Sequence, residues 1–396
     1  MTKKQTTRVN LVTASREWAS RPADERFWTL RELFERSKKY AQQSVTWNVQ
    51  LQASEVLATE SNDLVLYTGL DDERPATFQH YSFGQLCNIA SVPAGYLRGL
   101  PAPLAAANLN HGLQGVGGDQ VLLIHKNGGT QLRCVTSKDY SRIWNYQIAE
   151  MALALEENAG WMTPPARPSG VPGVPTRQAT DADVLKHSAH ASLGVKVGDE
   201  ISPAGLYCSD HDCFIFQVNE DHAIDAGGGE RLYRGVFWSD SEVGDAKFKG
   251  TMFLYDTICG NHIVWGAKVV AEIAIPHRGN AQEVFREAMA KATMLMDTCA
   301  SEDENRIKAA KMYEIGPGRA EVVEKVFRKF GTLSKLDYDN AYTLAMRHAE
   351  DHNTEPNTAW GYASGLTRLS QGMYADKRDS MDRIGGRILE MALVRS

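Results

Sequence analysis

A tight hairpin in the first half of the chain places the strongest constraint on its fold. Two apolar, strand-like segments, residues 120–126 and 130–135, flank the turn sequence Asn127-Gly128-Gly129. Asn and Gly tolerate the positive φ angles that a tight turn between antiparallel strands requires. The sequence therefore predicts an antiparallel strand pair at this position.

Helices and strands alternate in the rest of the N-terminal region, residues 1–162. Residues 24–43 have apolar side chains on one helical face and charged ones mostly on the other, whereas residues 45–68 contain strand-like alternation. Ser82 and Gln85 have capping-box spacing, which predicts that a helix begins at Ser82. A further helix is expected over residues 139–157.

Three more regions follow along the chain. Residues 163–178 are rich in Pro and Gly, which predicts either a linker between domains or a long surface loop within one domain. Residues 179–276 are rich in strand-like segments, and residues 277–396 carry apolar residues at three- and four-residue spacing. The predicted fold class is α+β, with an N-terminal α/β region, a largely antiparallel β-rich centre and a helical C-terminal region. The C-terminal helices are expected at residues 281–298, 320–330, 340–352, 358–371 and 379–393.

The composition is typical of a globular cytoplasmic protein. Of the 396 residues, 43% are hydrophobic and 23% are charged, which excludes wholesale disorder. The formal net charge of -6 argues against indiscriminate coating of duplex DNA but permits a local basic groove. No segment reaches the roughly 20 apolar residues of a membrane span, and six dispersed cysteines indicate reduced thiols rather than a disulfide scaffold.

The segment from Gly235 to His262 mixes strand-like stretches, polar turns and a Cys259-Gly-Asn-His262 element. Thiolates and imidazole are preferred zinc ligands, and clustered carboxylates bind magnesium. The candidate zinc ligands are Cys208, Cys213, Cys259 and His262, with His211 as a further donor; the candidate acidic ligands are Asp210, Asp212, Asp240, Glu242 and Asp245. Buried unpaired cysteines and solvated acidic turns are the commoner interpretations, so neither a metal nor another cofactor is predicted.

Sequence signatures of catalysis are absent. The chain contains neither G-x-S-x-G nor G-x-x-x-x-G-K-[ST], and the glycine cluster at residues 227–229 lacks the strand–turn–helix context of a phosphate loop. No catalytic residues are therefore assigned, and a non-enzymatic function is favoured.

Cations and aromatic residues alternate along the hairpin and the segment after it. Proteins that bind single-stranded nucleic acid combine cations along the backbone track with aromatic faces on which bases stack. The candidate nucleic-acid-binding residues are Lys126, Arg133, Lys138, Tyr140, Arg142 and Trp144. An equally weighted alternative is that the aromatic residues belong to the core and the cations to a solvated surface.

Five segments, considered in order, resemble a known family. They are residues 83–101, 122–140, 239–244, 258–261 and 358–367. These segments are similar to the phage/plasmid-like proteins of unknown function that prophages, phages and conjugative plasmids encode. The resemblance covers residues from about 80 to the end, and it departs at His262, where the family often has Gly after its Cys-x-Asn element. It implies a mobile-element context and work in replication, recombination, maintenance or evasion of host defence.

Three functions remain as hypotheses from the sequence. The first is binding of single-stranded DNA in the cytoplasm, with annealing of complementary strands by a homo-oligomer. The second is a metal-dependent enzyme that acts on nucleic acid and uses the acidic and Cys/His residues named above. The third is a protein that binds a host factor, since an acidic surface can mimic DNA.

Overall fold

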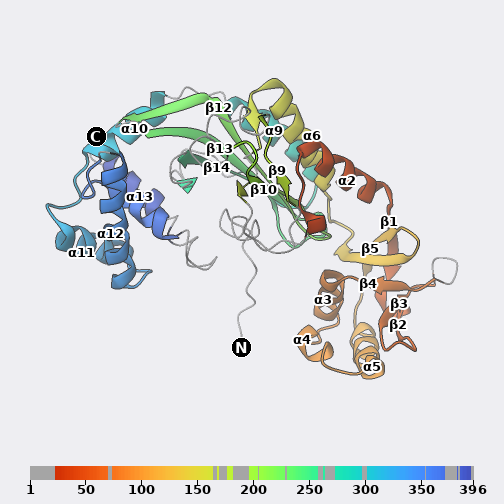
Figure 1. Cartoon of the computed structure of the whole chain (residues 1–396). Coiled ribbons are helices and arrows are strands. Elements are labelled where there is room, and N and C mark those ends of the chain that lie inside the picture. Colours follow the sequence, from red (N-terminus) through yellow and green to blue (C-terminus); the bar gives the residue numbers. More distant parts are fainter. Residues whose placement is uncertain are drawn as a thin grey trace.

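The protein has an α+β fold, as the sequence predicted (Figure 1). It was obtained as a computed structural model that describes residues 23–69, 74–163, 167–168, 176–181, 196–203, 205–227, 230–256, 262–263, 273–296, 301–352, 354–370, 381 and 384–393. Figure 1 shows an N-terminal sheet with its helices, a central sheet, and a group of helices at the opposite end of the molecule.

The N-terminal sheet is built around the predicted hairpin. Its strand order is β1-β5-β6-β4-β3-β2, and all neighbours are antiparallel except β4 and β6. The strands are β1 (Ser44–Gln50), β2 (Glu55–Ala58), β3 (Leu64–Tyr67), β4 (Ala76–Phe78), β5 (Asp119–Lys126) and β6 (Thr130–Ser137). The helices α3 (His80–Ile89), α4 (Ala94–Leu97) and α5 (Ala102–Leu113) share a core with this sheet. The predicted pairing of β5 with β6 across the Asn-Gly turn is confirmed.

The start of α3 differs from the prediction. The helix begins at His80 with Gln79 as its N-cap, so Ser82 is the third helical residue and not the cap. Ser82 Oγ donates to the carbonyl oxygen of Leu132 at 2.7 Å, and it also receives the backbone N–H of Gln79 at 3.0 Å. The sequence therefore correctly predicted a helix in this region, but it placed the N-cap three residues too late. The Ser82 hydroxyl bonds to Leu132, in a strand that is distant in sequence.

The central sheet carries the longest strands. Its order is β11-β12-β13-β14-β15, with β7 paired to β12 and β16 paired to β14. The strands are β7 (Trp161–Met162), β11 (Leu206–Cys208), β12 (Cys213–Gly227), β13 (Glu230–Asp240), β14 (Phe248–Asp256), β15 (His262–Ile263) and β16 (Ile273–Ile275). Three helices, α2 (Leu30–Gln42), α6 (Asn145–Asn158) and α9 (Ala281–Met296), share a core with these strands. The helix predicted over 139–157 is thus present but begins only at Asn145.

Helices dominate the C-terminal region, as predicted. They are α10 (Ser301–Met312), α11 (Arg319–Phe330), α12 (Lys335–His352) and α13 (Ala359–Ser370), followed by helical residues 384–389 and the short η3 (Glu390–Ala392). Their core includes Ile224 of β12 and Leu232 of β13, so these helices pack on the far end of the central sheet. The sequence did not predict α10.

Parts of the Pro/Gly-rich segment 163–178 pair into a small sheet. The described residues include β8 (Arg167–Pro168) and β9 (Arg177–Gln178), which flank β10 (Glu200–Ser202) in antiparallel pairs. Across the part of the chain that the structure describes, no helix is long and apolar enough to cross a membrane.

Candidate functional site

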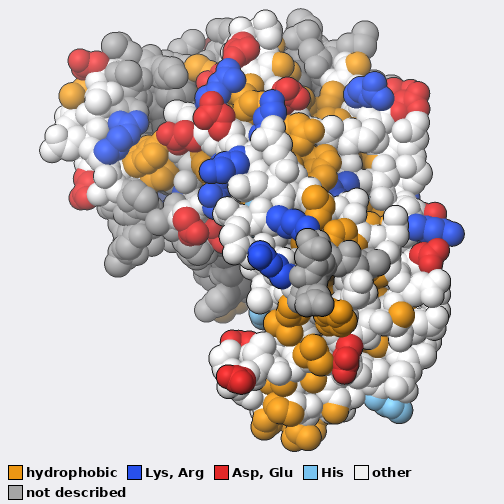
Figure 2. Space-filling model, turned by 90° about the vertical axis from the view of Figure 1, so that its right-hand side faces the viewer, with side chains coloured by type: hydrophobic (Ala, Val, Ile, Leu, Met, Phe, Trp, Pro, Cys, Tyr) orange, Lys and Arg blue, Asp and Glu red, His pale blue; other side chains and the backbone are white. Residues whose placement is uncertain are grey.

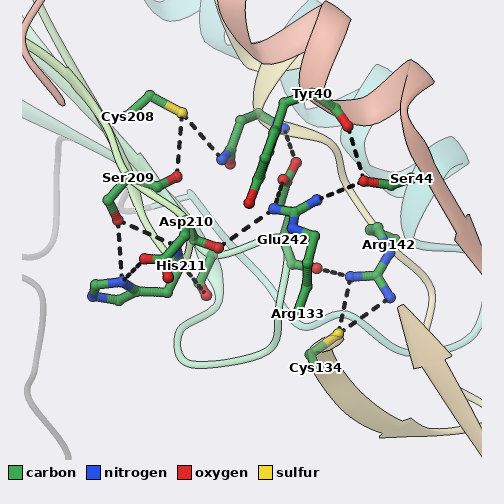
Figure 3. A network of polar contacts seen from close by, with 12 residues as sticks. Tyr40, Ser44, Arg133, Cys134, Arg142, Cys208, Ser209, Asp210, His211 and Glu242 are labelled. Carbon is green, nitrogen blue, oxygen red and sulfur yellow. Dashed lines mark hydrogen bonds and ion pairs between the residues drawn. The ribbon is translucent and has the colours of Figure 1, made fainter. Parts of the chain in front are cut away.

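A buried ion pair joins the N-terminal sheet to the central sheet. Arg133 of β6 contacts Glu242, which lies just after β13, and the two side chains are 0% and 3% exposed (Figure 3). The guanidinium also donates to Ser44 Oγ at 3.3 Å and to the Asp210 carbonyl oxygen at 3.4 Å. Burial lowers the pKa of Arg133, but Glu242, together with Tyr40 and Cys134, more than offsets this, so the pKa of Arg133 lies above its usual value. Arg133 is therefore a permanent interior cation that is held by its carboxylate.

Two further residues after β6 fix Glu242. The Asn145 backbone N–H, at the first turn of α6, donates to Glu242 Oε2 at 2.9 Å. Arg142 donates to the Glu242 backbone carbonyl and contacts Cys134 Sγ at 3.6 Å (Figure 3). The Arg142 guanidinium lies over the rings of both Tyr140 and Trp144, at 5.1 and 5.3 Å from their centroids. This network connects β6, α6 and the loop after β13 into one rigid junction.

Tyr40 of α2 covers this junction. Its ring lies 4.1 Å from the Arg133 guanidinium and 4.1 Å from the His125 ring centroid, and its hydroxyl accepts from Gln79 Nε2 at 2.8 Å. Burial raises the pKa of Tyr40 despite the nearby Arg133 cation. The side chains of Tyr40 and Arg36 line two pockets in common.

The first pocket, here termed the basic pocket, has a volume of about 240 Å³. It lies where the end of α2 meets the β5–β6 turn. The Lys126 N–H joins these two elements by donating to the Gln43 carbonyl oxygen at 2.8 Å. Arg36 and Lys39 are exposed at its rim, and burial, followed by the Arg133 charge, lowers the pKa of His125. Its lining residues are basic, aromatic or amide side chains: Arg36, Lys39, Tyr40, Gln43, His125, Asn127 and Gln131. Such a lining attracts anions and offers rings and amides to a polar ligand.

The second pocket, here termed the acidic pocket, has a volume of about 280 Å³. Asp210 lies in the turn between β11 and β12, where its carboxylate and His211 Nδ1 are 2.8 Å apart. This hydrogen bond is the largest cause of the lowered pKa of Asp210. The lining residues are Asp24, Glu25, Arg36, Ser37, Tyr40, Cys208, Ser209, Asp210 and Glu242.

The structure separates the candidate nucleic-acid-binding residues into three groups. Lys126 is exposed beside the basic pocket, with its Nζ 5.2 Å from the Trp47 ring centroid. Lys138 is exposed at the other end of the hairpin. Arg133, Arg142, Tyr140 and Trp144 belong to the junction network. The sequence-based assignment of Arg133 to phosphate contact does not fit its burial against Glu242, and Arg142 is held between two rings.

Four of the five candidate metal-binding carboxylates have other partners, and one of these, Asp210, pairs with His211 as described above. Asp240 pairs with His277 Nε2 at 3.0 Å in the interior, Glu242 pairs with Arg133, and Asp212 accepts from Ser209 Oγ at 2.5 Å. Cys259 lies outside the described residues, as does the environment of the His262 side chain. Within the described residues, no group of three or more His, Cys, Asp and Glu side chains is arranged to hold a metal ion.

Arg36 and Lys39 were missed as candidate site residues. In the sequence they occupy the polar face of an amphipathic helix, which is the usual pattern of a solvated surface. Their role at a pocket depends on the β5–β6 turn, about 90 residues further along the chain, which folds against the end of α2. In the sequence, these cations stand close to Tyr40 and Trp47, and this cluster of cations and aromatic residues is the signal that could have identified them.

No family model, no curated protein and no solved structure matches this chain. The resemblance to phage/plasmid-like proteins therefore stays an expectation from the sequence.

Proposed function

We propose that this protein binds single-stranded DNA and that the strand crosses the basic pocket. The observation that carries the proposal is the lining of that pocket, to which the cations Arg36 and Lys39 and the rings of Tyr40 and His125 all contribute. Cations neutralise phosphates, and aromatic rings stack on unpaired bases. Further cation–ring pairs lie on other faces of the same elements, with Lys126 over Trp47 and Lys38 over Phe34 at 5.2 and 4.9 Å.

The surface around the pocket supports this assignment. Figure 2 shows Lys and Arg side chains, with Asp and Glu side chains among them, on the face that carries α2 and the N-terminal sheet. The net charge of -6 repels DNA at long range, and the cations around the pocket attract it at close range. Relative to the sequence-based site, the proposal keeps Lys126 and replaces Arg133 and Arg142 with Arg36 and Lys39.

The test compares two double variants that remove the same charge. Arg36→Ala/Lys39→Ala removes the rim of the basic pocket, whereas Arg328→Ala/Lys335→Ala removes two exposed cations that pair with Glu324 in the C-terminal helices. Fluorescence anisotropy with a labelled oligothymidine should show weaker binding for the first variant alone. It should also show a salt slope smaller by about 0.7 for each phosphate contact removed.

Equal affinity and equal salt slope for the two double variants would place the DNA elsewhere. Equal weakening of both would show a non-specific charge effect and would also reject the basic pocket.

The wider parts of the proposal rest on the same binding activity. They are annealing of complementary strands by a homo-oligomer, a cytoplasmic location, and service to a phage or plasmid. A strand-annealing assay with complementary oligonucleotides, together with the mass of the protein in solution, tests the first of these.

A further inference from the structure

Two cysteines face each other next to the turn between β11 and β12. Cys208 and Cys213 are register partners, and the four-residue connection from Ser209 to Asp212 closes the hairpin. The Ser209 N–H donates to the Asp212 carbonyl oxygen at 2.9 Å, so residues 209 and 212 form a hydrogen-bonded pair. The adjacent pair, Cys208 and Cys213, is then a non-hydrogen-bonded pair, in which Cα atoms lie about 4.5 Å apart and side chains share one face of the sheet. Disulfides join Cα atoms that are roughly 4.4–6.8 Å apart.

The two thiols differ in accessibility. Cys208 is half-buried and lines the acidic pocket, where the Asn145 side-chain amide donates to its sulfur at 3.4 Å (Figure 3). Cys213 is 1% exposed and lies in the core under α6. The neighbouring Cys208 thiol, together with burial, raises the pKa of Cys213 well above its usual value. A reagent in the pocket can therefore reach Cys208 first. Cys213, the register partner of Cys208, can then react with the oxidised Cys208 sulfur.

We propose that Cys208 and Cys213 are a peroxide-reactive dithiol, with Cys208 as the attacking thiol and Cys213 as the resolving thiol. Cys208 Sγ attacks one peroxide oxygen, the O–O bond breaks, and a sulfenic acid and one water form. Cys213 Sγ then attacks the Cys208 sulfur, the S–O bond breaks, and a disulfide and a second water form. Two thiols lose two electrons and two protons, and one hydrogen peroxide is reduced to two waters. The reaction is independent of the proposed DNA binding.

The experiment uses the native full-length protein, treated with a chelator and then with equimolar hydrogen peroxide. Remaining thiols are blocked with N-ethylmaleimide in denaturant, and the masses of the tryptic peptides are measured by mass spectrometry. Both cysteines fall in the tryptic peptide of residues 197–231, because that segment contains no Lys or Arg before Arg231. The expected product is this peptide without maleimide and lighter by two hydrogens, with Cys87 and Cys134 still blocked by maleimide. Reduction of the oxidised protein with dithiothreitol before the blocking step should restore the maleimide adduct on both cysteines.

Two serine variants separate the roles of the thiols. In Cys213→Ser, Cys208 should remain as a sulfenic acid that dimedone traps, whereas in Cys208→Ser, Cys213 should keep its maleimide adduct after peroxide. Retention of both adducts in the wild-type peptide would overturn the proposal. So would a sulfinic acid on Cys208 without a cross-link, or an unchanged oxidation of Cys213 in Cys208→Ser.

Discussion

The guanidinium of Arg133 and the carboxylate of Glu242 are 109 residues apart in sequence, yet they form the most buried ion pair at the junction. Removing one partner of a buried pair leaves the other charge without compensation, which destabilises a protein by roughly 3–5 kcal/mol. Glu242→Gln should therefore lower the free energy of unfolding by about 3 kcal/mol or more, measured by urea denaturation at pH 7.

The matched control is the same substitution at Glu324, an exposed carboxylate that pairs with Arg328 and Lys335. Glu324→Gln should cause no measurable loss, because exposed pairs are screened by water and salt. Equal stability of the two variants would contradict the assignment of Arg133 and Glu242 as the structural centre of the junction.

His348 in α12 gives a pH dependence of stability with a definite sign. Its side chain is buried against His352, with ring centroids 4.4 Å apart. Burial, followed by the nearby His352, lowers the pKa of His348 from 6.5 to about 3. Between pH 6.5 and about 3, this histidine is protonated in the unfolded chain but neutral in the folded chain. The free energy of unfolding therefore falls as the pH falls from 6.5 toward 3.

The expected loss from this histidine is about 1.4 kcal/mol per pH unit below its unfolded pKa. His348→Leu, which keeps an apolar side chain in the core, should reduce the loss of stability between pH 6.5 and 5 by about 2 kcal/mol in urea titrations. His111→Leu, at an exposed position of α5, should leave the pH dependence unchanged. A wild-type slope in His348→Leu would show that His348 is protonated in the folded protein.

At the scale of elements, α12 and α13 approach each other closely through a glycine (Figure 1). A Cβ at Gly365 would overlap the Ala341 carbonyl oxygen and would lie 2.5 Å from the Ala345 nitrogen. Gly365→Ala should therefore destabilise the protein by about 1–3 kcal/mol in thermal or urea denaturation, because overpacking forces the two helices apart.

Gly84, in the interior of α3, is the control for this prediction. A Cβ there would lie 3.8 Å from the Arg98 Nη2 atom, which is an ordinary contact with a flexible side chain. Gly84→Ala should be neutral or stabilising by up to about 1 kcal/mol, since alanine favours a helix over glycine. A destabilisation of the same size in both variants would point to backbone effects instead of helix packing.

Elements with local signals were predictable from the sequence, and the site was not. The Asn-Gly turn fixed the β5–β6 pair, and apolar periodicity located α9, α11, α12 and α13. Helix α10 has little segregation of polar and apolar residues, so its sequence gave no such signal. The pairing of Arg133 with Glu242 joins two distant segments, and no local pattern distinguishes a cation that is buried against a carboxylate from one that faces DNA.

At the scale of the whole molecule, the charge is unevenly placed. Arg36 and Tyr40 line both pockets, which otherwise differ in charge: Lys39 and His125 line the first, whereas Asp24, Glu25 and Asp210 line the second. The carboxylates of the second pocket disfavour a polyanion there, so a single strand is expected to bind on the Lys39 and His125 side. We therefore propose that this chain, although acidic overall, has a local site for a single-stranded polyanion.

The most direct test is a salt series of fluorescence-anisotropy titrations with labelled single-stranded and duplex DNA of the same length. We expect tighter binding to the single strand at every salt concentration, and affinity that falls steadily as salt rises, because counterions are released from phosphates. No binding of either DNA at low salt, or equal binding of both with equal slopes, would contradict it.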